Sequence, residues 1–103
     1  MGRVNRRAPL DLYINKVVDG VPFLARTRDI SRGGVYVERL LEPLAHLDAP
    51  VAVEFVLPES DEVIWAEAEV VHGDPERGVG LRFKGLDPYF AGLIGAYVAH
   101  AAA

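Results

Sequence analysis

Two short segments concentrate the residues that could bind an anion. The first, Arg3-Val4-Asn5-Arg6-Arg7, places two arginines four residues apart, with Arg6 beside them. The second, Asp29-Ile30-Ser31-Arg32-Gly33-Gly34, combines a carboxylate, a hydroxyl, another arginine and two adjacent glycines. Guanidinium groups donate paired, charge-assisted hydrogen bonds to carboxylates and phosphates. The two segments are therefore the first candidates for a binding site.

The net charge of the chain hides an uneven distribution. The formal charge is -4, but residues 1–40 carry eight basic and four acidic side chains, whereas the remainder carries three basic and eleven acidic ones. A protein that grips long DNA or RNA usually has a positive overall charge, because phosphate neutralisation supplies most of the affinity. A local arginine cluster fits a small anionic ligand better, so we expect no nucleic-acid partner. For Arg26 and Arg39 a solvated surface role is preferred.

Composition bounds the class of protein. With 103 residues, 50% of them hydrophobic, the chain can build one compact domain around a single core. It has no cysteine, which excludes disulfides and thiolate metal sites and favours a reducing, cytoplasmic location. The basic start is followed by Ala8-Pro9-Leu10-Asp11, so it does not resemble a signal peptide. The apolar C-terminal stretch is too short to span a bilayer, and we expect no membrane association.

Alternating apolar residues predict the strands that must position these segments. Leu10, Leu12 and Ile14 alternate with other residues, and Asp19-Gly20 supplies a turn into a second run at 21–27, so the two runs predict a hairpin. Four more strand-like runs follow with no helix between them, at 35–38, 51–57, 63–71 and 79–83, with a loop around 43–50. In the run 63–71 one face carries Ile64, Ala66, Ala68 and Val70.

Only the end of the chain has helical periodicity. Asp87 suits an N-cap and Pro88 the first helical position. The apolar residues at helical spacing are Phe90, Leu93, Ile94, Tyr97 and Val98. Six antiparallel strands remove their free edges most economically by closing into a barrel, with the helix over one opening. The prediction is one mainly β domain over residues 1–103, with a flexible arginine-rich arm at 1–9, a six-stranded antiparallel barrel at 10–84 and a helix at 87–101.

The predicted hairpin brings the two polar segments together. The arginines lie just before its first strand, and the Asp-x-Ser-x-x-Gly pattern lies just after its second. In a hairpin of two equal strands, the start of the first lies beside the end of the second. We therefore expect the two segments to meet in space.

These motifs, in this order, resemble the PilZ family of bacterial cyclic di-GMP receptors. The residues that carry the resemblance are Arg3 and Arg7, then Asp29, Ser31 and Gly34, a strand ending in Val70-Val71-His72, and Gly78-Val79-Gly80-Leu81-Arg82-Phe83, which is similar to the family's closing strand. The resemblance covers nearly the whole chain. It implies a PilZ-type barrel whose N-terminal arm wraps cyclic di-GMP against the Asp-x-Ser-x-x-Gly turn, with no cofactor and no metal.

The resemblance also implies a role for each motif residue. Arg3 and Arg7 would bind phosphate oxygens or the O6/N7 edge of guanine through paired hydrogen bonds. Asp29 would accept hydrogen bonds from guanine N1–H and N2–H, and Ser31 would bind a phosphate or a base edge. Gly34 would let the backbone approach the ligand. Without the arginines, Asp29 and Ser31 would be interpreted as a local turn, with the glycines at positive φ.

Four further residues are possible auxiliaries. Arg6 and Arg32 would add positive charge, and Gly33 belongs to the same glycine pair. His72 stands where family members often carry an aromatic residue or arginine, so a stacking contact with guanine is one interpretation. An ordinary surface histidine at a strand end is the other, and the preferred, interpretation.

Other function classes find less support. Ser31 lacks the Gly-x-Ser-x-Gly context, His46, His72 and His100 have no metal-binding spacing, and no catalytic residue is assigned, so we expect no enzyme. A PilZ-like adaptor that acts only through protein contacts is the alternative, although such adaptors tend to lose the arginine motif. Single-stranded nucleic-acid binding would need more aromatics than Tyr13 and Tyr36. A receptor of this kind would act through an unidentified effector protein, as a monomer or weak homodimer.

Overall fold

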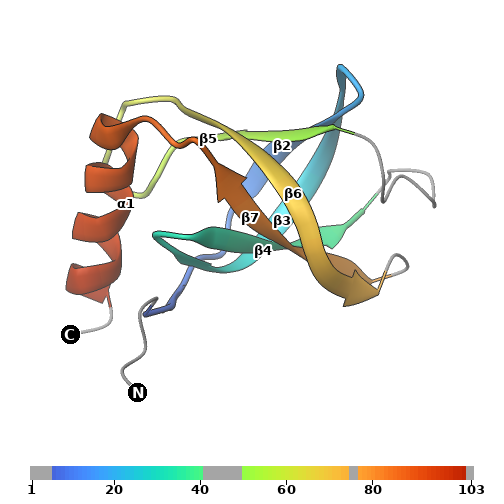
Figure 1. Ribbon diagram of the computed structural model, residues 1–103. Coiled ribbons are helices and arrows are strands. Elements are labelled where there is room, and N and C mark those ends of the chain that lie inside the picture. Colours follow the sequence, from blue (N-terminus) through green and yellow to red (C-terminus); the bar gives the residue numbers. More distant parts are fainter. Residues whose placement is uncertain (1–5, 41–49, 75–76, 102–103) are drawn as a thin grey trace.

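The computed structural model describes residues 6–40, 50–74 and 77–101, and Figure 1 shows their arrangement. The strands of this part are β1 (Ala8–Pro9), β2 (Tyr13–Val18), β3 (Val21–Ser31), β4 (Gly34–Arg39), β5 (Val51–Phe55), β6 (Ile64–Asp74) and β7 (Gly78–Lys84). The helix α1 spans Pro88–Ala101. The loop predicted around residues 43–50 lies outside the described residues except for Pro50.

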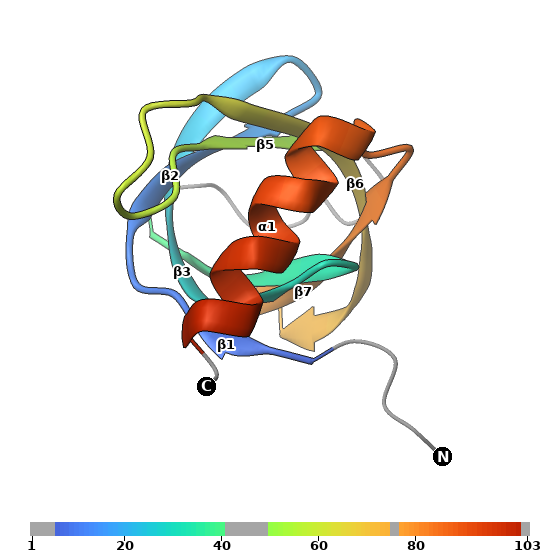
Figure 2. The same cartoon turned by 90° about the vertical axis from the view of Figure 1, so that its left-hand side faces the viewer.

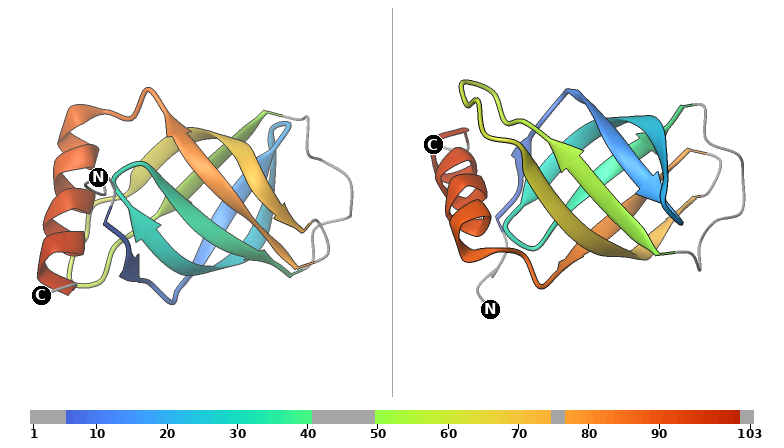
Figure 3. Two further views of the ribbon diagram at one scale, coloured as in Figure 1. Left: turned by 60° about the horizontal axis from the view of Figure 1, so that its bottom comes forward. Right: turned by 90° about the horizontal axis from the view of Figure 1, so that it is seen from above.

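Six strands close into an antiparallel barrel, and the two-residue β1 is added to it at β3. The strand order is β1-β3-β2-β5-β6-β7-β4, and β4 pairs back with β3. Closure depends on the length of β3, because residues 21–26 pair with β2 whereas residues 25–31 pair with β4. The two views of Figure 3 show opposite sides of the barrel, with β4 in front on the left and β5 in front on the right. The predicted six-stranded barrel with one C-terminal helix is confirmed.

Period-two burial along the strands builds the core. In β6 the side chains of Ile64, Ala66 and Ala68 are buried, whereas the residues between them, Trp65 and Glu67, are exposed. Ile30 on β3 and Val53 on β5 are fully buried inside the barrel. Each large aliphatic side chain removed from water in this way contributes about 1.5–3 kcal/mol to stability. The turn predicted at Asp19 and Gly20 joins β2 to β3, and both residues have the positive φ that a tight hairpin turn requires.

The helix α1 covers one open end of the barrel, as Figure 2 shows. Its N-terminus is capped as predicted, because Asp87 Oδ1 accepts a 2.8 Å hydrogen bond from the backbone N–H of Tyr89. Ile94 and Val98 are buried against the barrel. The hydroxyl of Tyr97 donates to the carbonyl of Pro9 over 2.6 Å, which ties the helix to β1. No helix among the described residues is long and apolar enough to cross a membrane.

Two details of the hairpin differ from the sequence prediction. Residues 28–31, read as part of a turn, extend β3, so that the turn itself shrinks to Arg32 and Gly33. Ala8 and Pro9, which the sequence analysis placed in a flexible arm, form β1 and pair with Ile30 and Asp29. The reason is that β3 extends beyond its pairing with β2, so that the residues before β2 can pair with the same side of β3.

Candidate functional site

Strand β1 places Arg7 beside the end of β3. In the pairing of β1 with β3, Ala8 is opposite Ile30 and Pro9 is opposite Asp29. Because the strands are antiparallel, Arg7 lies next to Ser31. Arg7 donates from Nε to Oδ1 of Asp29 over 2.7 Å, and its Nη2 lies 2.6 Å from the same oxygen. Its Nη1 donates to Ser31 Oγ at 3.4 Å. The two segments that the sequence predicted to meet are therefore in contact through Arg7.

The ion pair is open to solvent, whereas the hydroxyl beneath it is not. The side chains of Arg7 and Asp29 are 46% and 40% exposed, so a ligand can reach both. Exposed ion pairs of this kind contribute at most about 1 kcal/mol to folding. Ser31 is only 1% exposed. The Arg7–Asp29 ion pair is thus accessible to a ligand and contributes little to the stability of the fold.

Ser31 holds the β3–β4 turn in shape. Its Oγ accepts hydrogen bonds from the backbone N–H groups of Gly33 and Gly34, each over 3.2 Å. A serine that accepts from the following residues in this way forms a local side-chain turn. The turn is tied to the barrel as well, because the carbonyl of Gly33 accepts a 2.9 Å hydrogen bond from the N–H of Phe83.

Gly34 is required by the barrel. A Cβ at this position would overlap the carbonyl oxygen of Leu81 on β7, with which β4 pairs. Neither Gly33 nor Gly34 has a positive φ, so the turn does not need glycine for its backbone conformation. The sequence interpretation, in which Gly34 makes room for a ligand, therefore has a second explanation inside the protein.

A lateral row of outward-facing residues extends the site across the barrel. The strand registers align Asp29 with Tyr36, Tyr36 with Gly80, and Gly80 with His72, on β3, β4, β7 and β6. The rings of Tyr36 and His72 stack with centroids 6.3 Å apart and planes inclined by 28°. The imidazole covers Gly80, where a Cβ would collide with its ring. The result is an aromatic shelf, Tyr36 and His72, in line with Asp29.

Arg82 lies on the next row of the same surface. It aligns with Gly34 on one side and with Glu69 on the other, and its guanidinium donates to the Glu69 carboxylate. This hydrogen bond, assisted by the charge of Arg82, lowers the pKa of Glu69 from its ordinary value. An Arg82–Glu69 ion pair therefore borders the glycine turn on the side opposite Arg7.

The remaining predicted residues have different positions. Arg32 extends towards α1, where its Cδ lies 3.2 Å from the position that a Cβ on Gly95 would occupy. Arg6 is exposed. Arg3 lies outside the described residues.

From the sequence, no binding role is assigned to Tyr36, Gly80 or Arg82, which border the candidate site in the structure. Tyr36 is related there only to single-stranded nucleic acid, and the other two only to a strand motif. The alternation of buried and exposed residues along each strand is the sequence signal that could have identified these three residues. In a closed antiparallel sheet, the residues that alternate with buried Val35, Val79 and Leu81 all face outwards.

The arrangement suits anion and base recognition. An accessible guanidinium, a carboxylate and an aromatic shelf can bind phosphate, hydrogen-bond donors and a planar ring, respectively. Among the described residues, no group of three or more His, Cys, Asp or Glu side chains could hold a metal ion.

Comparisons with known proteins identify structures with a similar fold. Eleven chains of solved structures match, and three of them illustrate the shared fold. The Bacillus subtilis inhibitor of motility (MotI/DgrA) has a TM-score of 0.79 and 19% identity, over 97% of this chain and 51% of that one. Borreliella burgdorferi PlzA in complex with c-di-GMP has a TM-score of 0.68 and 15% identity, over 94% and 41%. The PilZ domain of Escherichia coli YcgR with c-di-GMP has a TM-score of 0.69 and 16% identity, over 99% and 92%.

These identities are low, and the chain spans only about half of MotI and two fifths of PlzA. Among curated proteins no significant match is found. The family model for the PilZ domain matches residues 2–100, which is nearly the entire sequence. The chain therefore belongs to the PilZ domain family.

Proposed function

We propose that this protein is a cyclic di-GMP receptor that binds the nucleotide at Arg7, Asp29 and Ser31. The observation that carries the proposal is the solvent-exposed ion pair of Arg7 with Asp29, in which the guanidinium also contacts the buried hydroxyl of Ser31. The family supports the choice of ligand, since two structures with the same fold, PlzA and the YcgR PilZ domain, contain c-di-GMP.

Arg7 is positioned to bind an anion without leaving Asp29. Its contacts to Asp29 use Nε and one N–H of Nη2, and its contact to Ser31 uses one N–H of Nη1. A guanidinium has five N–H groups, so each terminal nitrogen retains a second donor. These donors would bind a phosphate or the O6/N7 edge of guanine, and Arg3 would supply a second guanidinium from the arm.

Asp29 and the shelf would recognise the base. Both Arg7 contacts fall on Oδ1 of Asp29, and a carboxylate has acceptor sites on both oxygens. Oδ2 would accept from N1–H and N2–H of guanine, donors that adenine does not offer in this pattern. The stacked rings of Tyr36 and His72, in the same row as Asp29, would support the planar base. Gly33, Gly34, Arg6 and Arg32 would contribute backbone and charge around the turn.

Signalling would follow from ordering of the N-terminal arm. The arm carries like charges at Arg3, Arg6 and Arg7, which a dianionic ligand would neutralise. Binding would then create a composite surface of arm, nucleotide and barrel for an effector protein to recognise. Amide hydrogen exchange with and without cyclic di-GMP should show ligand-induced protection at both 3–8 and 29–35. If ligand binds and residues 3–8 gain no protection, the output arises elsewhere in the domain.

Titration calorimetry with a matched pair of arginine variants tests the site. We expect cyclic di-GMP to bind in the low-micromolar range or tighter, about 8 kcal/mol, and cyclic di-AMP and GTP to bind far more weakly. Arg7→Ala should abolish binding and leave the melting temperature nearly unchanged. Arg26→Ala is the control, because Arg26 pairs with Asp11 over the same 2.7 Å and is 44% exposed.

The outcomes separate the alternatives. Binding by Arg7→Ala at the wild-type level would place the site elsewhere, and an unfolded Arg7→Ala variant would make the residue structural. A wild-type chain that binds no cyclic di-GMP would favour the other hypothesis, an adaptor that acts through protein contacts alone.

A further inference from the structure

A second surface of the barrel exposes apolar side chains away from the arginine site. The described residues expose nine large apolar side chains, and five of these gather on the outer face of β2, β5 and the adjoining parts of β3 and β6: Tyr13, Leu24, Val56, Val63 and Trp65. We call this set the apolar face. Soluble monomers rarely expose contiguous apolar patches beyond a few hundred Å² unless the patch binds something.

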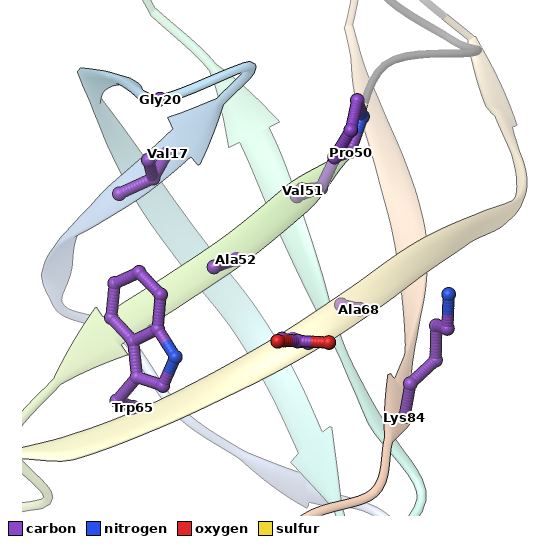
Figure 4. Close-up of a pocket in the computed structure, with 9 residues that line it drawn as sticks. Val17, Gly20, Pro50, Val51, Ala52, Trp65, Ala68 and Lys84 are labelled. Carbon is purple, nitrogen blue, oxygen red and sulfur yellow. The ribbon is translucent and has the colours of Figure 1, made fainter.

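Two hollows shape the apolar face. One, of about 400 Å³, is lined by Tyr13, Leu24, Val56 and Val63 among others. The other, of about 300 Å³, has Val17 and Ala52 in its lining, and Figure 4 shows the indole of Trp65 at one side of it and Lys84 at the other. A row of side chains separates the hollows, in which Asn15 Nδ2 donates to Glu54 Oε1 over 3.2 Å. The apolar face therefore has two apolar hollows, with a row of polar side chains between them.

The topology of the barrel decides how a partner could bind here. Both β2 and β5 are hydrogen-bonded to a strand on each side. The apolar face thus has no free strand edge, and an added β-strand cannot pair with it. Recognition must come from side chains, as when an amphipathic helix lies in an apolar groove.

The spacing of the hollows fits a helix. Tyr13 and Val17, which line different hollows, are four positions apart on β2, and this separation corresponds to about 13 Å. In an α-helix, residues i and i+8 lie about 12 Å apart along the axis. Apolar side chains at such positions on one helix face can occupy both hollows together.

Charge around the apolar face selects the partner's chemistry. The charged residues that line the hollows are Glu54, Glu67 and Lys84, and Asp61 and Glu62 precede Val63 in the sequence. Arg26, whose guanidinium lies over the ring of Tyr13, forms an ion pair with Asp11. Around this face, acids therefore outnumber bases by five to two. A second copy of the chain would bring the same acids against these, and like charges across an interface are unfavourable. Basic residues beside the apolar ones would complement the surface.

We propose that the apolar face docks a basic amphipathic helix of a partner protein. The helix inserts one apolar side chain into each hollow and places Lys or Arg side chains against Glu54 and Glu67. The surface lies on strands that the arginine site does not use, apart from the other ends of β3 and β6 (Figure 3). It is independent of whether the site at Arg7 binds cyclic di-GMP.

A displayed library of 18-residue helical peptides, selected on the full chain, tests the proposal. Trp65 is the only tryptophan, so its emission reports on this face alone. Selected peptides should carry apolar residues one hollow spacing apart, flanked by Lys or Arg, and should shift the Trp65 emission to shorter wavelength.

Uncharged substitutions of exposed residues supply the controls. Leu24→Asn, at a position 44% exposed, should weaken peptide binding about tenfold or more. Val71→Asn, at a position 47% exposed outside the apolar face, should change it less than about twofold. Selection that yields no peptide able to shift Trp65 emission would overturn the proposal, as would equal binding by Leu24→Asn. Sedimentation that shows a dimer which Leu24→Asn dissociates would replace the helix by a second copy.

Discussion

Replacing Ser31 by alanine should destabilise the barrel out of proportion to the size of the change. Ser31 Oγ accepts from the N–H groups of Gly33 and Gly34, and the second of these bonds is buried. Without the oxygen, both N–H groups lose this acceptor. Each intramolecular hydrogen bond contributes about 0.5–1.5 kcal/mol to stability, so we expect a total loss of about 2 kcal/mol. For a domain of this size, this corresponds to a fall in melting temperature of about 8–16 °C.

Ser60→Ala is the matched control. Ser60 Oγ also accepts a backbone N–H two residues ahead, from Glu62 over 3.1 Å, but this bond is exposed. Water can replace the lost acceptor there, so the free energy of unfolding should change by less than about 0.5 kcal/mol. Thermal and urea unfolding followed by circular dichroism would measure both variants. Equal effects, or no loss of stability in Ser31→Ala, would refute the reasoning that the hydroxyl holds the turn.

Four further substitutions probe the glycines and an ion pair. Gly34→Ala should unfold the chain or lower its melting temperature strongly in the same assay, because the added methyl overlaps a β7 carbonyl oxygen. Gly92→Ala should stabilise α1 by about 1 kcal/mol, since nothing lies within 4 Å of the new methyl, whereas Gly95→Ala should gain less because an arginine side chain lies 3.2 Å away; urea unfolding compares the two. Asp11 should titrate below the ordinary range of aspartate in NMR-detected titration, because the hydrogen bond from Arg26 lowers its pKa, and Arg26→Gln should raise that pKa. Because the folded-state pKa is lowered, the pair stabilises the fold above the unfolded-state pKa, and this stabilisation is lost as the pH falls through the folded-state value.

The fold was predictable where local pattern and burial agree. Ile64, Ala66 and Ala68 alternate with exposed residues and face the core, as their period of two requires. Asp87 and Pro88 marked the start of α1, because capping depends on residues adjacent in sequence. The meeting of Arg7 with Asp29 followed from hairpin geometry alone.

The rest of the site depends on contacts between strands distant in sequence. Tyr36, Gly80 and His72 come into line only through the registers of β4, β7 and β6, and the register shifts between Val70 and His72. An irregularity of one residue reverses which side chains face outwards, so no pattern within one strand could place His72 beside Tyr36. The reading of Arg28 to Ser31 as a turn failed for a related reason, since β4 extends the pairing of β3.

Gly34 and Ser31 lie in the candidate site and also have structural roles. These two facts predict how the domain would change under relaxed selection. If Arg7 and Asp29 bind a nucleotide as proposed, a descendant that no longer needed it could lose both residues with little loss of stability, because their ion pair is half exposed. Gly34 and Ser31 would persist, since the first fits against the Leu81 carbonyl and the second satisfies backbone donors inside the turn. Retention of the serine and glycine in a related barrel would thus record the ancestry of the fold, and only the arginine and the aspartate would record the ligand.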